Sequence, residues 1–200
     1  MTTVVSDAAA AVAAFATTNI DDFLVLTALF ATAGGAGVRR RHITGGQYAG
    51  MGVLVGISGG LAVVFLALPD TWVGVLGLVP IALGIRGLAR ARGAATDQRQ
   101  AAAAPVRGWL AVAGVTVANG ADNVSLYTPL FRQASAGGVA VYVVVFALMV
   151  ALWCTAALFL ARRGPMIALM AVAGHWVVPA VFIAIGALII ARSGLILTFS

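Results

Sequence analysis

The chain contains no lysine and no glutamate: its twelve basic residues are all arginine and its six acidic residues are all aspartate. Charged residues make up only 9% of the 200 residues, whereas a soluble domain carries about 25%. Hydrophobic residues make up 62%, and the mean hydropathy is +1.06. A soluble fold of this length could not bury so much apolar surface. The shortage of charge therefore excludes a soluble domain and predicts an integral membrane protein.

Cysteine is almost absent as well. The one cysteine, Cys154, lies inside an apolar run, which excludes an intramolecular disulfide and a metal site built from several thiolates. No nucleophile–base pair or His/Cys ligand set indicates an enzyme. The net charge of +6 would suit nucleic acid, but the arginines lie in short segments between long apolar runs. We therefore expect no catalytic activity, no nucleic-acid partner and no bound cofactor.

Six apolar runs approach or exceed the roughly 20 residues that a helix needs to cross a bilayer. The predicted fold class is therefore all-α integral membrane, with six transmembrane helices. The runs lie between Asp7 and Arg39, from Tyr48 to Leu68, from Trp72 to Leu88, between Arg107 and Arg132, from Val139 to Leu160 and from Ile167 to Ile190. Polar turns separate them at 39–42, 69–70, 136–138 and 162–165, and an Ala/Arg-rich linker occupies 89–107.

The arginines are distributed unequally between the two sides that these helices define. Ten of the twelve fall in or beside the loops after the first, third and fifth helices. Because short cytoplasmic loops are enriched in basic residues, this pattern predicts that the three loops are cytoplasmic and that both termini lie outside. The 89–107 linker is then cytoplasmic. The basic loops are also expected to contact anionic lipid.

An internal repeat relates the two halves of the chain. A shift of 101 residues aligns Asp21 with Asp122, Thr27 with Thr128 and Phe30 with Phe131. The repeats are predicted to cover residues 1–88 and 108–200, with three helices each. An odd number of helices makes the second repeat enter the membrane from the opposite side. Inverted repeats of this kind are typical of secondary transporters, whose sites lie near the bilayer midplane.

Polar residues gather near the centre of the first and fourth predicted helices. An aspartate at that depth costs about 2.5–3.5 kcal/mol, so such residues usually face the bundle interior and mark an ion or substrate path. The candidate site residues are Asn19, Asp21, Asp22, Asn119, Asp122 and Asn123, with Thr18, Tyr127 and Pro129 in support. Helical spacing favours Asp22 as the inward residue because it shares a face with Asn19, whereas the repeat favours Asp21.

The chemistry of this set indicates a cation. Carboxylate and amide oxygens suit divalent ions, while no positive side chain at this depth would hold an anion. The aspartates are also candidate proton carriers, because burial favours the neutral form of a carboxyl group. The alternative is that the amides and carboxyls only join the helices through hydrogen bonds.

The two motifs, Thr18-Asn19-Ile20-Asp21-Asp22 and Ala118-Asn119-Gly120-Ala121-Asp122-Asn123, the second followed by residues 127–131 (Tyr-Thr-Pro-Leu-Phe), resemble the bacterial cadmium resistance transporter (CadD-like) family. This family belongs with the lysine exporter superfamily. The resemblance covers nearly the whole chain and implies efflux of Cd²⁺ across the bacterial cytoplasmic membrane. The oxygen-rich site agrees with a divalent cation but leaves zinc and manganese open beside cadmium.

The chain has no phosphate-binding loop, so we expect secondary export, with protons moving inward as the simplest source of energy. The expected partners are a divalent metal cation, protons and membrane lipid, and a homo-oligomer is left open. The alternative function is export of amino acids or other small metabolites, which the wider superfamily also contains. For that function, the helix N-terminus near Gly120 would hold a substrate carboxylate. A membrane scaffold without transport is a third reading.

Overall fold

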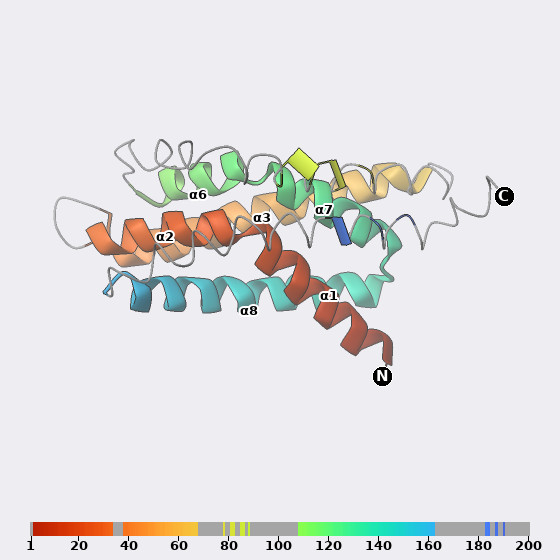
Figure 1. Cartoon of the computed structure of the whole chain (residues 1–200), viewed down its shortest axis with the longest axis horizontal. Helices are drawn as coiled ribbons and strands as arrows, with labels where there is room; N and C mark the ends of the chain where they lie inside the picture. Colours follow the sequence, from red (N-terminus) through yellow and green to blue (C-terminus); the bar gives the residue numbers. More distant parts are fainter. Residues whose placement is uncertain are drawn as a thin grey trace.

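The computed structural model describes residues 2–33, 38–67 and 108–162, together with the isolated residues 78, 81, 82, 85, 86, 88, 183, 184, 187 and 190. Its elements are α1 (Thr2–Thr18), α2 (Ile20–Thr32), α3 (Arg40–Val64), η1 (Phe65–Ala67), α6 (Gly108–Asn119), α7 (Ala121–Gln133) and α8 (Ala136–Leu160) (Figure 1). The all-α prediction is confirmed for these residues. The predicted linker, and nearly all of the third and sixth predicted helices, lie outside them.

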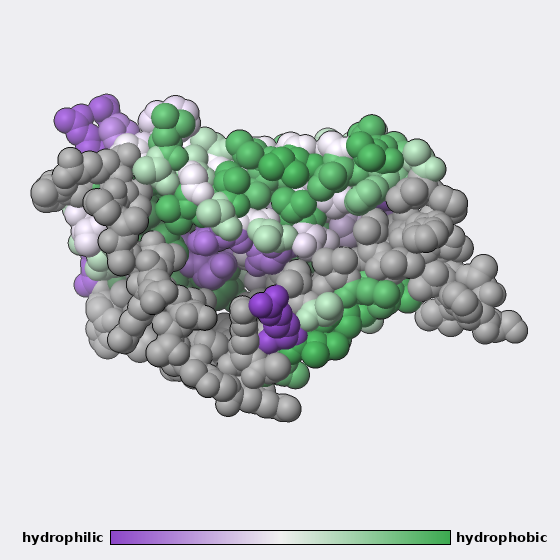
Figure 2. All heavy atoms as spheres, turned by 90° about the horizontal axis from the view of Figure 1, so that it is seen from above, coloured by the Kyte–Doolittle hydropathy of each residue, from purple (hydrophilic) through white to green (hydrophobic). Residues whose placement is uncertain are grey.

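Two of the described helices are long and apolar enough to cross a membrane. They are Arg40–Ala67, which includes η1, and Ala136–Leu160, and each contains an apolar stretch of 18 residues, with mean hydropathies of 2.1 and 2.6 respectively. The pair α1 and α2 makes a third span if it is counted as one bent helix. Figure 2 shows hydrophobic side chains along much of the visible flank, while hydrophilic ones gather at one end and near the middle. This is the surface of a membrane protein; the count of six spans stays a prediction.

Both long helices begin earlier than their apolar runs. Residues 40–42 were predicted as a turn but form the first turn of α3, and residues 136–138 were also predicted as a turn but form the first turn of α8. The side chain of Ser135 caps α8 by accepting a hydrogen bond from the backbone N–H of Gly138 at 3.1 Å. Hydropathy marks only the apolar stretch, so it misses helical turns that extend beyond the hydrocarbon.

The first predicted helix is broken into α1 and α2, which meet at Asn19 with a bend of 61°. Residues 17–19 explain the break. Their side chains all donate to the carbonyls four residues earlier, at distances between 2.6 and 3.0 Å. Such bonds compete with the backbone ladder and bend helices.

The fourth predicted helix is broken as well, at Gly120 between α6 and α7. Asn19 and Gly120 differ by 101 positions, the shift that aligns Asp21 with Asp122, and both adopt a similar backbone conformation (φ −118°, ψ 20° and φ −83°, ψ 15°). Glycine is needed at 120 because a Cβ there would collide with the side chain of Leu54 on α3. Pro129, in contrast, lies inside α7, which continues to Gln133.

Each long helix packs mainly against the broken helix of the other half: α3 against α6 and α7, and α8 against α1 and α2. The two broken helices run in opposite directions (Figure 1). A pair of inverted repeats would pack in this way. The complete three-plus-three repeat stays a prediction. Aromatic contacts join α1, α7 and α8 into one core through Phe15, Tyr127, Phe131, Tyr142 and Phe146.

Close packing of α3 against α6 depends on Gly46 and Gly50. A Cβ on Gly50 would lie 2.6 Å from Cβ of Thr116, and one on Gly46 would lie 2.5 Å from the carbonyl oxygen of Trp109. The sequence suggests a packing face at residues 52, 56 and 60 instead, but a Cβ on those glycines would meet no described atom within 4 Å. The contact between Gly50 and Thr116 brings the two helices together beside the site.

The two ends of the bundle differ in their residues. Arg132 donates to the carbonyl oxygen of Phe65 at 3.1 Å, so the ends of η1 and α7 meet at the end where α1 and α8 begin. At the other end, Phe30, Arg40 and Leu158 line one cavity of about 290 Å³. The basic segments after α2 and after α8 therefore share one end, as the arginine pattern predicts. Which side of the membrane that end faces stays a prediction.

Candidate functional site

An uncharged cluster joins the two broken helices, and we call it the amide–tyrosine cluster: Thr18, Asn19, Asn123 and Tyr127. Each of these side chains is at most 1% exposed. Nδ2 of Asn19 lies 3.1 Å from Oδ1 of Asn123 and 3.0 Å from Oη of Tyr127, and that hydroxyl lies 2.9 Å from Oγ1 of Thr18. Within the described residues, Oδ1 of Asn19 is buried without a hydrogen-bond partner. The cluster therefore ties α1 to α7.

A second cluster surrounds Asp22 and joins three helices; we call it the carboxylate cluster: Asp22, Gln47, Thr116 and Asn119. The Asp22 side chain is 3% exposed. Its Oδ2 accepts a hydrogen bond from Nε2 of Gln47 at 3.1 Å, and its Oδ1 accepts one from Nδ2 of Asn119 at 3.3 Å. Oγ1 of Thr116 donates to Oε1 of Gln47 at 2.7 Å. Neutral amides from α3 and α6 thus hold this carboxylate.

Asp21 and Asp122 occupy matching positions in the two halves. Each is the second residue of the helix after a break, and each accepts a hydrogen bond from the next backbone N–H, at 3.0 Å in α2 and 2.9 Å in α7. Both are half-buried. The positive end of a helix stabilises a carboxylate at this position. Asp122 is also close enough to Asp21 and Asp22 for its carboxyl group to interact electrostatically with both.

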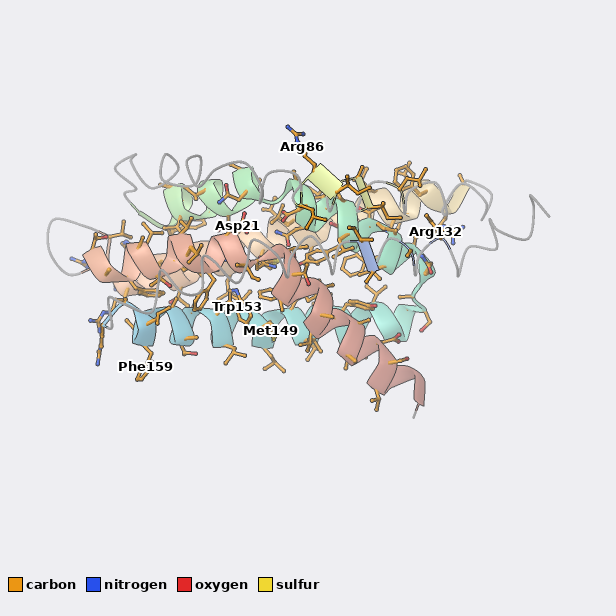
Figure 3. The ribbon with its side chains drawn as sticks, viewed as in Figure 1. Asp21, Arg86, Arg132, Met149, Trp153 and Phe159 are labelled. Atoms are coloured by element: carbon orange, nitrogen blue, oxygen red, sulfur yellow. The ribbon has the colours of Figure 1, made fainter. Side chains whose placement is uncertain are left out.

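The choice between Asp21 and Asp22 resolves into two different roles. Asp22 points into the bundle, as helical spacing predicts, whereas Asp21 corresponds to Asp122, as the repeat predicts. Figure 3 places Asp21 in the central part of the long axis, away from Arg132 at one end. In the described part of the chain no arginine forms an ion pair with any of the three carboxylates. Among the described residues, these three carboxylates therefore have neutral hydrogen-bond partners but no positively charged one.

Trp153 on α8 fills the bend between α1 and α2. Its ring makes edge contacts with Phe15 on one side and Phe23 on the other, at centroid distances of 5.5 and 5.6 Å. Its Nε1 donates to the carbonyl oxygen of Asn19 at 2.8 Å, as a second donor beside the backbone N–H of Phe23 at 2.9 Å. The indole therefore holds the helix break in place beside the aspartates (Figure 3).

The sequence model of the cadmium resistance transporter family matches residues 15–200, which include every candidate site residue. The chain belongs to the cadmium resistance transporter family. No curated protein and no solved structure has a significant match to it. Membership agrees with the resemblance carried by the two motifs and makes the chain a membrane transporter.

Three residues of the transporter's site are absent from the candidates that the sequence suggests: Gln47, Thr116 and Trp153. Gln47 precedes the apolar run that begins at Tyr48, so hydropathy leaves it in a loop, although it lies in the second turn of α3. A single Thr116 in an apolar helix is an ordinary residue. Trp153 is 134 residues from Asn19, and no local pattern links them.

A transported metal ion would need further oxygen ligands in addition to carboxylates. Among the described residues, no group of three or more His, Cys, Asp or Glu side chains is placed to hold a metal ion. Amide, hydroxyl and carbonyl oxygens are abundant around the aspartates, and they are the ligands that hard divalent ions prefer. Cys154 lines the cavity with Arg40 and Phe30 and takes no part in either cluster.

Proposed function

We propose that this transporter exports divalent heavy-metal cations, Cd²⁺ or a similar ion, as a proton-coupled secondary transporter. One observation carries the proposal. Asp21, Asp22 and Asp122 all lie in the first turn after the two helix breaks, where they are buried or half-buried, and none forms an ion pair with a described arginine. Uncompensated carboxylates in a membrane are costly, and a transported cation is the partner that would neutralise them.

The proposed ligands come from both broken helices. Asp21 and Asp122 are half-buried and bonded only to backbone N–H groups, so they are the first to meet an entering ion. Asp22 lies deeper. The amides of Asn19, Asn119 and Asn123 would supply further oxygens, and the unpartnered Oδ1 of Asn19 supports that role. Binding would exchange the present amide–carboxylate bonds for metal–oxygen bonds.

The energy for export must come from outside the site. Moving a divalent cation outward against an inside-negative potential of 100 mV costs about 4.6 kcal/mol. In the proposed cycle, the aspartates bind metal in the ionised form when they face the cytoplasm. They take up protons from outside when the metal leaves. We place the transporter in the bacterial cytoplasmic membrane with six spans, both termini outside and the basic loops in the cytoplasm.

Proton coupling is tested with purified transporter in sealed vesicles that contain a metal-sensitive dye. An inwardly directed Cd²⁺ gradient is combined with a pH gradient of either sign. We expect the rate of Cd²⁺ entry to rise when protons can leave the vesicle in exchange and to fall when the pH gradient is reversed. A Cd²⁺ flux that ignores the pH gradient would contradict proton coupling but not metal transport. Inhibition of the flux by amino acids would favour a metabolite exporter.

A further inference from the structure

Gln47 is the only side chain that contacts both Asp22 and Thr116 in the carboxylate cluster. It is 1% exposed and lies on α3 between Gly46 and Gly50, the two glycines that let α6 approach closely. Its amide connects three helices: Nε2 donates to Asp22 on α2, and Oε1 accepts from Thr116 on α6. These two hydrogen bonds give the amide one defined orientation in the structure.

The charge of Asp22 decides that orientation. An ionised carboxylate only accepts hydrogen bonds, so Gln47 must turn its N–H group toward it. A divalent cation held by Asp22 reverses the requirement, because the ion attracts oxygen and repels an N–H donor. The oxygen and nitrogen of a glutamine amide occupy almost the same shape, so a half-turn of the amide exchanges them without moving the backbone.

Thr116 can accommodate both orientations. Its Oγ1 lies 2.7 Å from Oε1 of Gln47 and 3.3 Å from the carbonyl oxygen of Val112. In the structure the hydroxyl donates to Gln47. After the amide turns, the same hydroxyl can donate to Val112 and accept from Nε2 of Gln47, because a hydroxyl is both donor and acceptor. Neither state leaves a buried polar atom of these two side chains without a partner, which keeps the exchange inexpensive.

We propose that Gln47 is a further ligand of the transported cation, and that its amide turns from donating to Asp22, as in this structure, to presenting Oε1 to the ion when the ion is bound. The inference rests on the proposed function. Thr116 is a positioning residue in this scheme, since it acts on the ion through Gln47. Gln47 would then favour ions that accept a hard oxygen ligand.

A simpler role for Gln47 predicts the opposite effect on binding. If its N–H group only held Asp22 in place, it would compete with the ion, and removing it would tighten cation binding. If Oε1 binds the ion, removing the amide weakens binding. The sign of the change therefore separates the two roles, whatever the substitution does to stability.

The test measures the affinity of the purified full-length transporter for Cd²⁺ and Mn²⁺ by titration calorimetry. We expect Gln47→Met, which keeps the chain length but has no amide, to weaken binding about 10- to 100-fold, and Gln47→Glu, which keeps an oxygen, to retain it. Thr116→Val should weaken binding about tenfold, and Thr116→Ser should restore it. Thermal unfolding without metal shows whether each variant is folded.

The outcomes are distinguishable. Unchanged or tighter binding in a folded Gln47→Met variant, with normal binding by the wild type, would overturn the role of Gln47 alone. A wild type that binds neither Cd²⁺ nor Mn²⁺ would overturn the proposed function and this inference with it. Wild-type binding that Asp22→Asn leaves intact would show that the ion is held elsewhere.

Discussion

The two helix breaks lie at matching positions and have similar backbone dihedral angles, but different residues form them. The break between α1 and α2 is made by side chains that bond to their own helix and by Trp153, which takes the carbonyl of Asn19. The break between α6 and α7 is made by Gly120 and by the side chain of Leu54 that fills the space above it. Because the positions correspond but the residues do not, the break itself is the feature that both halves keep.

The residues after the breaks differ in one charge. Asp21 and Asp122 are matched, but the buried residue that follows is an aspartate in α2 and an amide, Asn123, in α7. The amide belongs to the uncharged cluster that joins the halves, and Asp22 to the cluster that contains Gln47. The first half thus supplies the more deeply buried carboxylate, Asp22, and the second half supplies an uncharged amide, Asn123, at the matching position. The sequence leaves open that these polar groups join the helices through hydrogen bonds. Asn19 and Asn123 do so, whether or not they also bind the ion.

Removing the negative charge of Asp22, or moving it to residue 123, should have the largest effect on Cd²⁺ binding. Asp22→Asn is expected to lower Cd²⁺ affinity about 10- to 100-fold, because it removes the deepest carboxylate. The double variant Asp22→Asn/Asn123→Asp restores the net charge but places it beside Asn19 and Tyr127, without Gln47. We expect it to remain as weak as the single variant in a calorimetric titration. Recovery of wild-type affinity would mean that the two halves are interchangeable.

A side chain at the second break should destabilise the fold. Gly120→Ala places a Cβ against Leu54 and is expected to cost about 1–3 kcal/mol by overpacking. The matched control is Gly114→Ala on α6, where a Cβ meets nothing within 4 Å, and there we expect a gain of about 0.5–1 kcal/mol. Thermal unfolding in detergent measures both. Partial recovery in Gly120→Ala/Leu54→Ala would identify the collision as the cause, and equal stability of both alanine variants would contradict it.

Loss of the tryptophan hydrogen bond should have a smaller effect on the first break. Trp153→Phe keeps ring contacts with Phe15 and Phe23 but removes the donor to the carbonyl of Asn19. We expect a loss of about 0.6–1.7 kcal/mol, the size of an interhelical hydrogen bond in a membrane. Trp109→Phe, at an exposed position on α6, is the control. If both variants unfold at the same temperature as the wild type, Trp153 does not hold the bend.

The smallest effect is expected at Cys154. It is buried near Thr44 and lines the cavity at the basic end, away from both clusters. Cys154→Ser should leave Cd²⁺ export unchanged, because the proposed site uses oxygen ligands. Export is measured as the loss of Cd²⁺ from preloaded cells. Abolished export with normal protein levels would point to a thiolate ligand and a softer site than the one described.

Local sequence patterns predict part of this arrangement well. A depth argument places Asp21, Asp22 and Asp122 in the middle of their helices, and the shift of 101 residues matches the two breaks. These inferences rest on hydropathy and on repeated motifs, which a single sequence contains. Glycine and proline both weaken helices, so the sequence predicts weak points at Gly120 and Pro129 in the fourth predicted helix; the helix is broken at Gly120, but α7 continues past Pro129.

Contacts between distant segments explain what the sequence could not predict. The bend at Asn19 depends on Trp153, and the environment of Asp22 depends on Gln47 and Thr116, which lie on other helices. Gln47 lies just before the apolar run that begins at Tyr48, because polar residues at the start of α3 lower the hydropathy of that helical segment. Close packing of α3 against α6 occurs at Gly50 and not at the evenly spaced glycines 52, 56 and 60. This packing brings Gln47 next to Thr116.

The most direct test of metal export is the cadmium content of a metal-sensitive bacterial host. It compares four strains: empty cells, and cells that contain the wild type, Asp122→Asn or Asp7→Asn at equal amounts in the membrane. Asp7 is the matched control, since it lies beside Gly138 at the start of α8 and outside both clusters. We predict low cadmium with the wild type and Asp7→Asn, and cadmium at the level of empty cells with Asp122→Asn. Equal cadmium in all four strains would contradict cadmium export, and low cadmium with Asp122→Asn would contradict the site at the helix breaks.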